Sequence, residues 1–225
     1  MEIELKYYLN DEIAKERIFN DKHLTEIKDP DFDETIEMKA VYMDTAQKDL
    51  MKKEMAFRVR REGERMVATL KWGGSAKDGL HVRGELNVPV DEQFVRSPNV
   101  DVFKGSEIYE EIKAAAGDRA LQKVMEMDFT RKEIRVDTGK SISVISLDEG
   151  WIRTDGGDAP ISELEIEFYS GDQDDMIELG MELAAKYNLQ TSDKSKYQRG
   201  LELLEIAPDW ENKIGNEPEK KDKFK

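Results

Sequence analysis

The sequence predicts an α+β fold in which a β-barrel turns the charged faces of its strands inward and carries helices on its outside. First, several strand-like segments alternate charged and apolar residues, which puts charge on one face of each strand and apolar side chains on the other. Second, some of these segments carry only acidic residues on their charged face and another carries only arginines. Neighbouring like charges repel on a solvent-facing strand, so this segregation favours charged faces that turn inward. Third, residues 172–188 have the pattern of an amphipathic helix, whose apolar face can pack against the apolar outer faces of the strands.

Eight segments have the alternation of a strand. In residues 55–62, for example, Arg58 and Arg60 lie on one face and Phe57 and Val59 lie on the other. The same pattern opens the chain and returns near its end, where glutamates take the charged positions. The expected strands are, in order, residues 2–9, 34–44, 55–62, 64–72, 80–90, 127–137, 140–153 and 161–169.

Helical signals fall between and after these strands. Asn10-Asp11-Glu12 offers an N-cap with acidic residues in the first turn, and Gly117 is a typical helix stop. The expected helical segments are residues 11–19, 46–53, 106–116, 118–124, 172–188 and a short one ending near residue 206. No linker rich in Gly, Ser or Pro divides the chain. We therefore expect one domain over residues 1–206 and a charged, mobile tail over residues 207–225.

Gly73-Gly74-Ser75 lies between two expected strands and predicts a hairpin turn. The chain has no GxxxxGK[ST] sequence, so a phosphate-binding loop is not indicated there. The two histidines, His23 and His81, are too few and too far apart in sequence to indicate a zinc site.

The composition excludes several classes of function. With 50 acidic and 35 basic residues the net charge is −15, which repels duplex nucleic acid and anionic membranes. No apolar run approaches the length of about 18 residues that a membrane span needs, and no signal peptide is visible. Cysteine is absent, which removes disulfides and thiol chemistry. We expect a cytoplasmic protein that does not bind membranes or nucleic acid.

The charged strand faces fit a phosphorylated ligand and a divalent cation. Residues 2–6 and 163–167 present carboxylates, residues 57–60 present arginines, and residues 83–87 present both signs. Carboxylates suit Mg²⁺ or Mn²⁺, which take oxygen ligands, whereas Arg and Lys hold phosphate oxygens. If these faces line a shared lumen, a small phosphorylated substrate is predicted inside it.

Glu2-Ile3-Glu4-Leu5-Lys6 resembles the ExExK signature of the triphosphate tunnel metalloenzymes, also called the CYTH superfamily. ExExK alone is a weak signal, but further matching elements follow in the expected order over about residues 1–204. These are Tyr42-Met43-Asp44-Thr45, Ala56-Phe57-Arg58-Val59-Arg60-Arg61, Thr69-Leu70-Lys71, the segment 80–88, Phe129-Thr130-Arg131, Leu147-Asp148-Glu149-Gly150, the segment 163–167 and the segment 195–200.

The resemblance implies an eight-stranded antiparallel barrel forming a tunnel, helices outside it, and metal-dependent chemistry on a triphosphate. Carried over by position, the expected ligands of Mg²⁺ or Mn²⁺ are Glu2, Glu4, Glu85, Asp148, Glu163 and Glu165. Glu167 shares the face of the last two, and which two of these three glutamates bind metal stays open. The expected phosphate-binding residues are Lys6, Arg58, Arg60, Lys71, Arg83, Arg131, Lys196 and Arg199. Of the catalytic residues, Glu2 would orient the attacking water, and Lys71 or Lys196 would neutralise the leaving pyrophosphate.

The expected reaction is hydrolysis of inorganic tripolyphosphate, because the motif spelling most resembles the bacterial inorganic triphosphatase branch. That branch often carries an appended helical phosphate-binding domain, which these 225 residues do not show. A class IV adenylyl cyclase and a thiamine triphosphatase are alternatives on the same tunnel, although no set of base-recognition residues stands out. A non-catalytic polyphosphate- or nucleotide-binding module is the alternative from another class. Either a monomer or a homodimer is compatible with the sequence.

Overall fold

The computed structural model of the chain describes residues 1–9 and 11–205, and the tail predicted over residues 207–225 lies outside this range. The strands are β1 (Glu2–Tyr8), β2 (Lys28–Thr45), β3 (Met55–Glu62), β4 (Arg65–Lys77), β5 (Leu80–Pro89), β6 (Leu121–Asp137), β7 (Ser141–Thr154), β8 (Gly157–Gly171) and β9 (Gln190–Thr191). The helices are α1 (Glu12–Phe19), α2 (Lys22–Ile27), α3 (Glu92–Arg96), α4 (Tyr109–Ala116), α5 (Gln173–Tyr187) and α6 (Lys196–Leu203), with 3-10 turns η1 (Met51–Lys53) and η2 (Val100–Phe103).

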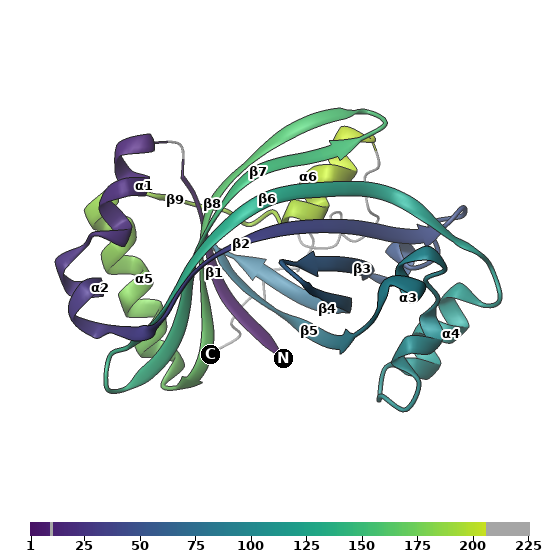
Figure 1. Cartoon of the computed structure of the whole chain (residues 1–225), viewed down its shortest axis with the longest axis horizontal. Coiled ribbons are helices and arrows are strands. Elements are labelled where there is room, and N and C mark those ends of the chain that lie inside the picture. Colours follow the sequence, from purple (N-terminus) through teal and green to yellow (C-terminus); the bar gives the residue numbers. More distant parts are fainter. Residues whose placement is uncertain (10, 206–225) are drawn as a thin grey trace, which may run out of the picture.

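Eight of the strands close into an antiparallel barrel, as predicted (Figure 1). The order around the barrel is β5-β4-β3-β2-β6-β7-β8-β1, and β1 pairs back with β5 to complete the ring. The short β9 pairs with β1 beside that seam. Closure leaves the eight barrel strands without a free edge and encloses a lumen.

The outward faces of the strands form apolar layers beneath the helices. Leu5 and Ile166 are buried in one cluster with Met176, Leu179 and Leu183 of α5, which covers one end of the barrel. A second cluster joins the outer faces of β3 and β4 to η2 and α4, where Phe57 and Phe103 meet edge to face. In Figure 1, α5 and α4 lie at opposite ends of the molecule.

Helix α6 packs against β7 and β8, as α5 does, but it also sends side chains to the lumen. Its Leu201 is fully buried in a third apolar cluster with Met127 of β6 and Ile152 of β7. Ser195 caps the helix, and its side chain accepts a hydrogen bond from the backbone N–H of Gln198 while the Gln198 side chain accepts one from Ser195. This capping box fixes the start of α6 at the tunnel wall.

The prediction of a hairpin turn at Gly73-Gly74-Ser75 is wrong. β4 continues to Lys77, and the chain reverses at Asp78-Gly79, where both residues have positive φ (53° and 83°), as a two-residue hairpin turn favours. Pairing between β4 and β5 skips from Trp72 opposite Gly84 to Ser75 opposite Val82. The glycine pair, with φ of 57° and 111°, therefore forms a β-bulge.

The helical turn predicted over residues 118–124 is also wrong, because β6 already begins at Leu121. Gly117 ends α4 with a φ of 60°, as expected, and Leu121 then pairs with Thr45 at the end of β2. Pairing between these two strands extends both well past the predicted limits. In the described ranges, no helix is long and apolar enough to cross a bilayer.

Candidate functional site

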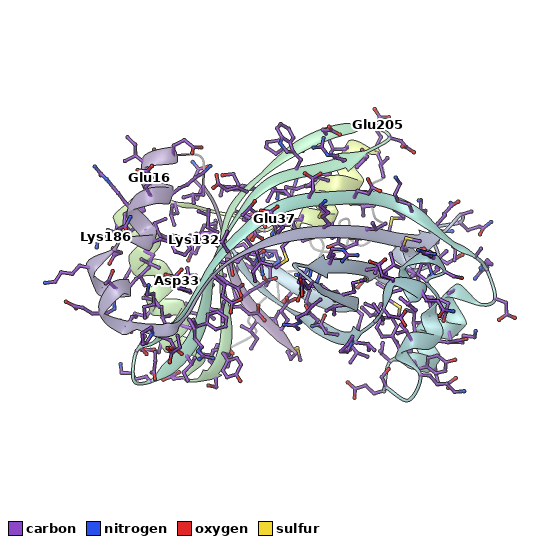
Figure 2. The ribbon with its side chains drawn as sticks, viewed as in Figure 1. Glu16, Asp33, Glu37, Lys132, Lys186 and Glu205 are labelled. Atoms are coloured by element: carbon purple, nitrogen blue, oxygen red, sulfur yellow. The ribbon has the colours of Figure 1, made fainter. Side chains whose placement is uncertain are left out.

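The lumen collects the charged strand faces into one cavity, because side chains alternate along each strand and the apolar ones face the helices. By contrast, the labelled carboxylates Glu16 and Asp33 lie at the end of the molecule that carries α1, α2 and α5, away from the lumen (Figure 2). The cavity has a volume of about 100 Å³. The predicted site residues that line it are Glu2, Glu4, Lys6, Arg58, Arg60, Lys71, Arg83, Glu85, Arg131, Glu165 and Lys196, together with Glu167. Asp148 and Glu163 do not line it but contact Lys196, and Arg199 contacts Glu163.

One group of carboxylates lies where β1 meets β5 and β8. The Lys71 ammonium is 2.7 Å from a Glu2 oxygen and 2.6 Å from a Glu85 oxygen. The Arg83 guanidinium donates to Glu2 at 2.6 Å and to Glu4 at 2.7 Å. Burial alone would raise the pKa of Glu2, but Lys71 and Arg83 outweigh it and hold that pKa well below its usual range.

Glu167 belongs to the same group, since it pairs directly with Glu4 across β1 and β8. Its side chain is open to water in the tunnel yet surrounded by protein. Burial, followed by the charges of Glu2, Glu4 and Glu85, raises the pKa of Glu167 to about 7. Among residues 1–9 and 11–205, no lysine or arginine nitrogen lies within 4 Å of it. Within the described ranges Glu167 therefore forms no ion pair, and the charge of Lys71 only partly counters the rise of its pKa.

A second group consists of Asp148, Glu163 and Glu165, whose nearest oxygens all lie within 4.8 Å of one another. Such spacing suits a metal ion, but here Lys196 is 2.7 Å from Asp148 and 2.9 Å from Glu165, and it also contacts Glu163. Burial alone would raise the pKa of Asp148, but Arg131 and Lys196 hold it below its usual value.

Further cations surround the second group. Arg131 donates two hydrogen bonds of 2.7 Å to Asp148 and one of 2.6 Å to Glu165. Arg199 donates to Glu163 at 2.7 Å, and Lys6 contacts Glu165. The three carboxylates of this group are thus matched by four cations, in contrast to the group at Glu167.

Arg58 and Arg60 lie on β3, across the lumen from the carboxylates. Arg58 is buried, donates a 3.3 Å hydrogen bond to Thr69, and has no carboxylate within 4 Å in the described part of the chain. Arg60 contacts Glu62, and the Nε atoms of both arginines are buried without a hydrogen-bond partner. Buried donors without acceptors indicate a place for an anionic ligand.

Two tyrosines that were not among the predicted site residues complete the wall. Tyr42 of β2 and Tyr197 of α6 stack with ring centroids 4.9 Å apart, and both line the lumen. Burial would raise the pKa of Tyr42, but Arg58, Lys71 and Arg83 outweigh it and lower that pKa. Only the register of β2 and the docking of α6 bring these rings together, and neither can be inferred from the two sequence positions.

Comparison with known proteins places this geometry in a family. The CYTH domain matches residues 1–201. The inorganic triphosphatase of Haemophilus influenzae is 30% identical over 174 residues, which are 76% of this chain and 48% of that protein. The chain thus spans about half the length of this curated relative.

Solved structures have the same fold. A candidate adenylyl cyclase from Hippeastrum, described as having a dominant triphosphatase activity, superposes with a TM-score of 0.68 at 19% identity and covers 94% of this chain and 99% of its own. A candidate adenylate cyclase from Bacillus halodurans gives a TM-score of 0.60 at 21% identity, with 88% and 96% covered. At these identities the likeness concerns the fold. Since the family match spans nearly all of the described residues, the chain belongs to the CYTH domain family.

Proposed function

We propose that this chain is a metal-dependent triphosphatase that hydrolyses inorganic tripolyphosphate to pyrophosphate and phosphate inside the barrel. The observation that carries the proposal is the division of the lumen. Among the described residues, Glu167 on one side has no ion-pair partner, and Arg58 on the other side has neither a carboxylate within 4 Å nor a hydrogen-bond partner for its Nε. A metal–triphosphate complex supplies the two missing partners at once. The similarity to an inorganic triphosphatase, and to a fold neighbour with triphosphatase activity, supports this substrate class.

Glu2, Glu4 and Glu167, with Glu85 beside them, are the proposed ligands of Mg²⁺ or Mn²⁺. Their carboxylates are of the type that hard cations prefer. Burial and then the neighbouring carboxylates raise the pKa of Glu167, and a bound cation would favour its ionised form. The metal, when bound, would neutralise phosphate oxygens and make the phosphorus more electrophilic. Glu165, a further ligand that the resemblance implied, would have to leave its ion pairs with Lys6, Arg131 and Lys196 to bind this metal.

Asp148 and Glu163 take a different role in this proposal from the metal ligation that the resemblance implied. Each is fully buried and already bonded to two cations of the phosphate-binding set. We assign them to orient Lys196, Arg131 and Arg199. A metal entering this group would meet the Lys196 ammonium at the centre of its ligands.

The phosphates would lie among Arg58, Arg60, Arg131, Lys6 and Lys196. The arginines offer two N–H donors in one plane to the oxygens of a phosphate, and Arg58 can do so without giving up an ion pair. Glu2, whose low pKa keeps it ionised, would orient a water molecule towards the terminal phosphorus. As the water oxygen bonds to phosphorus, the bond to the bridging oxygen breaks, and Lys71 or Lys196 would stabilise the charge on the departing pyrophosphate.

Phosphate and pyrophosphate release from tripolyphosphate and from ATP tests the proposal, with Mg²⁺, Mn²⁺ or EDTA. Wild type should cleave tripolyphosphate only with metal, and Glu4→Gln should lose at least about 100-fold in kcat, as loss of a group acting on the transition state does. Glu178→Gln, an exposed change on α5, is the matched control and should retain activity. Cyclic AMP and pyrophosphate from ATP would favour a cyclase instead, and tight binding without turnover would favour a binding module.

A further inference from the structure

A row of polar side chains crosses the barrel wall from β3 to β5, and the proposed reaction gives its two middle members no role. Strand pairing places Arg58 opposite Thr69, and Thr69 opposite Asn87. Glu85 lies two residues before Asn87 and therefore on the same face of β5. The row thus begins at a proposed phosphate-binding residue and ends at a carboxylate beside the proposed metal.

Hydrogen bonds join the four side chains of this row in one direction. The Arg58 guanidinium donates to the Thr69 hydroxyl at 3.3 Å, and that hydroxyl donates to the side-chain oxygen of Asn87 at 2.7 Å. The amide nitrogen of Asn87 donates to a Glu85 oxygen at 2.5 Å. The donors therefore follow one another from the cation to the anion, and both neighbours of Asn87 favour the same orientation of its amide.

Thr69 is fully buried, and its hydroxyl makes two of these contacts inside the wall. Valine has nearly the same shape as threonine and is also favourable in a strand. Burial of a hydroxyl costs free energy unless the group is hydrogen-bonded, so packing alone does not explain a threonine at this position. The contacts of Thr69 therefore indicate that the hydroxyl itself is used.

Arg58 and Glu85 carry opposite charges on one wall, yet within the described ranges they form no ion pair with each other. Burial alone would lower the pKa of Arg58, but Tyr42 and then Glu85 outweigh it and raise that pKa, so the two groups attract one another. Two strand spacings of about 4.8 Å each separate β3 from β5, and long side chains can cross such a gap. A direct ion pair would occupy both groups, and Thr69 and Asn87 stand between them.

We propose that Thr69 and Asn87 are positioning residues that prevent Arg58 from pairing with the carboxylate on β5. Thr69 holds one guanidinium nitrogen and leaves the unpartnered Nε of Arg58 for a phosphate oxygen. Asn87 holds one oxygen of Glu85, whose other oxygen lies 2.6 Å from the Lys71 ammonium. The inference rests on the proposed function, because the two side chains kept apart belong to the phosphate and metal sites of that proposal.

The chemistry of position 87 requires an amide in this role. An amide accepts a hydrogen bond at its oxygen and donates from its nitrogen, so Asn87 serves the Thr69 hydroxyl and the Glu85 carboxylate together. A carboxylate at this position could accept but not donate, and its charge would repel Glu85. The amide therefore orients Glu85 without adding charge to the wall.

Thr69→Val tests the proposal, because it removes the hydroxyl with little change of shape. The kcat for tripolyphosphate hydrolysis should fall about 10- to 100-fold, and Thr69→Ser, which keeps a hydroxyl, should recover most of it. In an Arg58→Met background Thr69→Val should change kcat less than about twofold, because Thr69 acts through Arg58. Thr130→Val is the matched control, since the Thr130 hydroxyl donates to Glu37 at 2.9 Å outside the lumen, and it should retain activity. Equal losses from Thr69→Val in both backgrounds would overturn the proposal.

Crystal structures of the metal-free variants separate this inference from the proposed function, because they need no turnover. In Thr69→Val the Arg58 guanidinium should turn to within about 4 Å of a Glu85 oxygen, while the backbone of β3, β4 and β5 keeps its place. Asn87→Ala, at an exposed position of β5, should give the same ion pair if Thr69→Val does not fold. If wild type cleaves no triphosphate, the proposed function fails and these structures still decide the inference. Arg58 and Glu85 in unchanged positions would contradict it.

Discussion

Asp148 is a buried carboxylate that forms ion pairs with Arg131 and Lys196, so its removal should lower the free energy of unfolding. Asp148→Asn leaves Arg131 and Lys196 with excess buried charge, and breaking a buried ion pair from one side costs about 3–5 kcal/mol. Urea denaturation of the metal-free protein measures the change in unfolding free energy. Asp33→Asn, which breaks a surface pair with Lys28, is the control and should cost about 0–1 kcal/mol. Equal effects of the two changes would contradict the role given to Asp148.

Glu167 should make the stability of the metal-free protein depend on pH in a direction opposite to that of the paired carboxylates. Its pKa is about 7 in the folded protein, above the ordinary value of 4.5, so the folded state binds more protons between these limits than the unfolded chain. Stability contributed by this group is present below about pH 4.5 and is lost as the pH rises through 7.

Thermal unfolding at pH 5.5, 6.5, 7.5 and 8.5 in EDTA tests that dependence. Wild type should lose thermal stability across this series, and Glu167→Gln should lose less, because the glutamine cannot ionise. Glu178→Gln should follow wild type. Parallel curves for wild type and Glu167→Gln would show that Glu167 does not titrate near pH 7.

At the scale of the elements, Gly150 fixes how closely β7 approaches β6. A Cβ at this position would lie 2.1 Å from the Asp128 carbonyl oxygen and 2.4 Å from the Phe129 Cα, which are backbone atoms that cannot turn aside. Gly150→Ala should therefore cost about 1–3 kcal/mol of unfolding free energy, as overpacking does. At Gly180 of α5 the nearest atom is the end of the Leu5 side chain, and alanine favours a helix. Gly180→Ala should therefore cost less unfolding free energy than Gly150→Ala. Urea denaturation measures both, and a larger cost for Gly180→Ala would contradict this account.

The alternation of charged and apolar residues predicted all eight barrel strands, because each strand has one face towards the apolar layers and one towards the lumen. It could not predict where β2 and β6 begin or that β6 replaces a helix at Leu121, since these limits depend on pairing between residues far apart in sequence. The same holds for the bulge at Gly73-Gly74. Its glycines signal positive φ in the sequence, but a turn and a bulge both use that conformation.

The candidate site could be predicted in its residue types but not in its grouping. Glu163, Glu165 and Glu167 have identical sequence patterns. The register between β1 and β8 puts Glu167 opposite Glu4, whereas the docking of α6 puts Lys196 against Glu163. Which of the three glutamates forms an ion pair is therefore decided by tertiary structure.

At the scale of the whole molecule, the closed barrel confines acidic and basic groups that neutralise one another only in part. A metal–triphosphate complex that fills the lumen binds the folded state alone and so should stabilise it. At a concentration of about 100 times the dissociation constant the gain is about 2.7 kcal/mol. For a chain of this length that corresponds to a rise of about 5–10 °C in the midpoint of thermal unfolding.

Calorimetric scans with Mg²⁺ alone, tripolyphosphate alone and both together check this rise, which should be largest for the pair. Glu4→Gln should abolish most of it, and Glu178→Gln should keep it. A rise of the same size with tripolyphosphate alone, unaffected by EDTA, would mean that the cationic side of the lumen binds phosphate without a metal.

The position of the metal tests the central claim most directly. Crystals of the protein grown with Mn²⁺ and an imido analogue of tripolyphosphate would show the ion by its anomalous scattering. We predict the peak among Glu2, Glu4 and Glu167, with the analogue's phosphates reaching Arg58 on the opposite wall. A peak among Asp148, Glu163 and Glu165 with Lys196 displaced, or an analogue bound outside the barrel, would contradict the account.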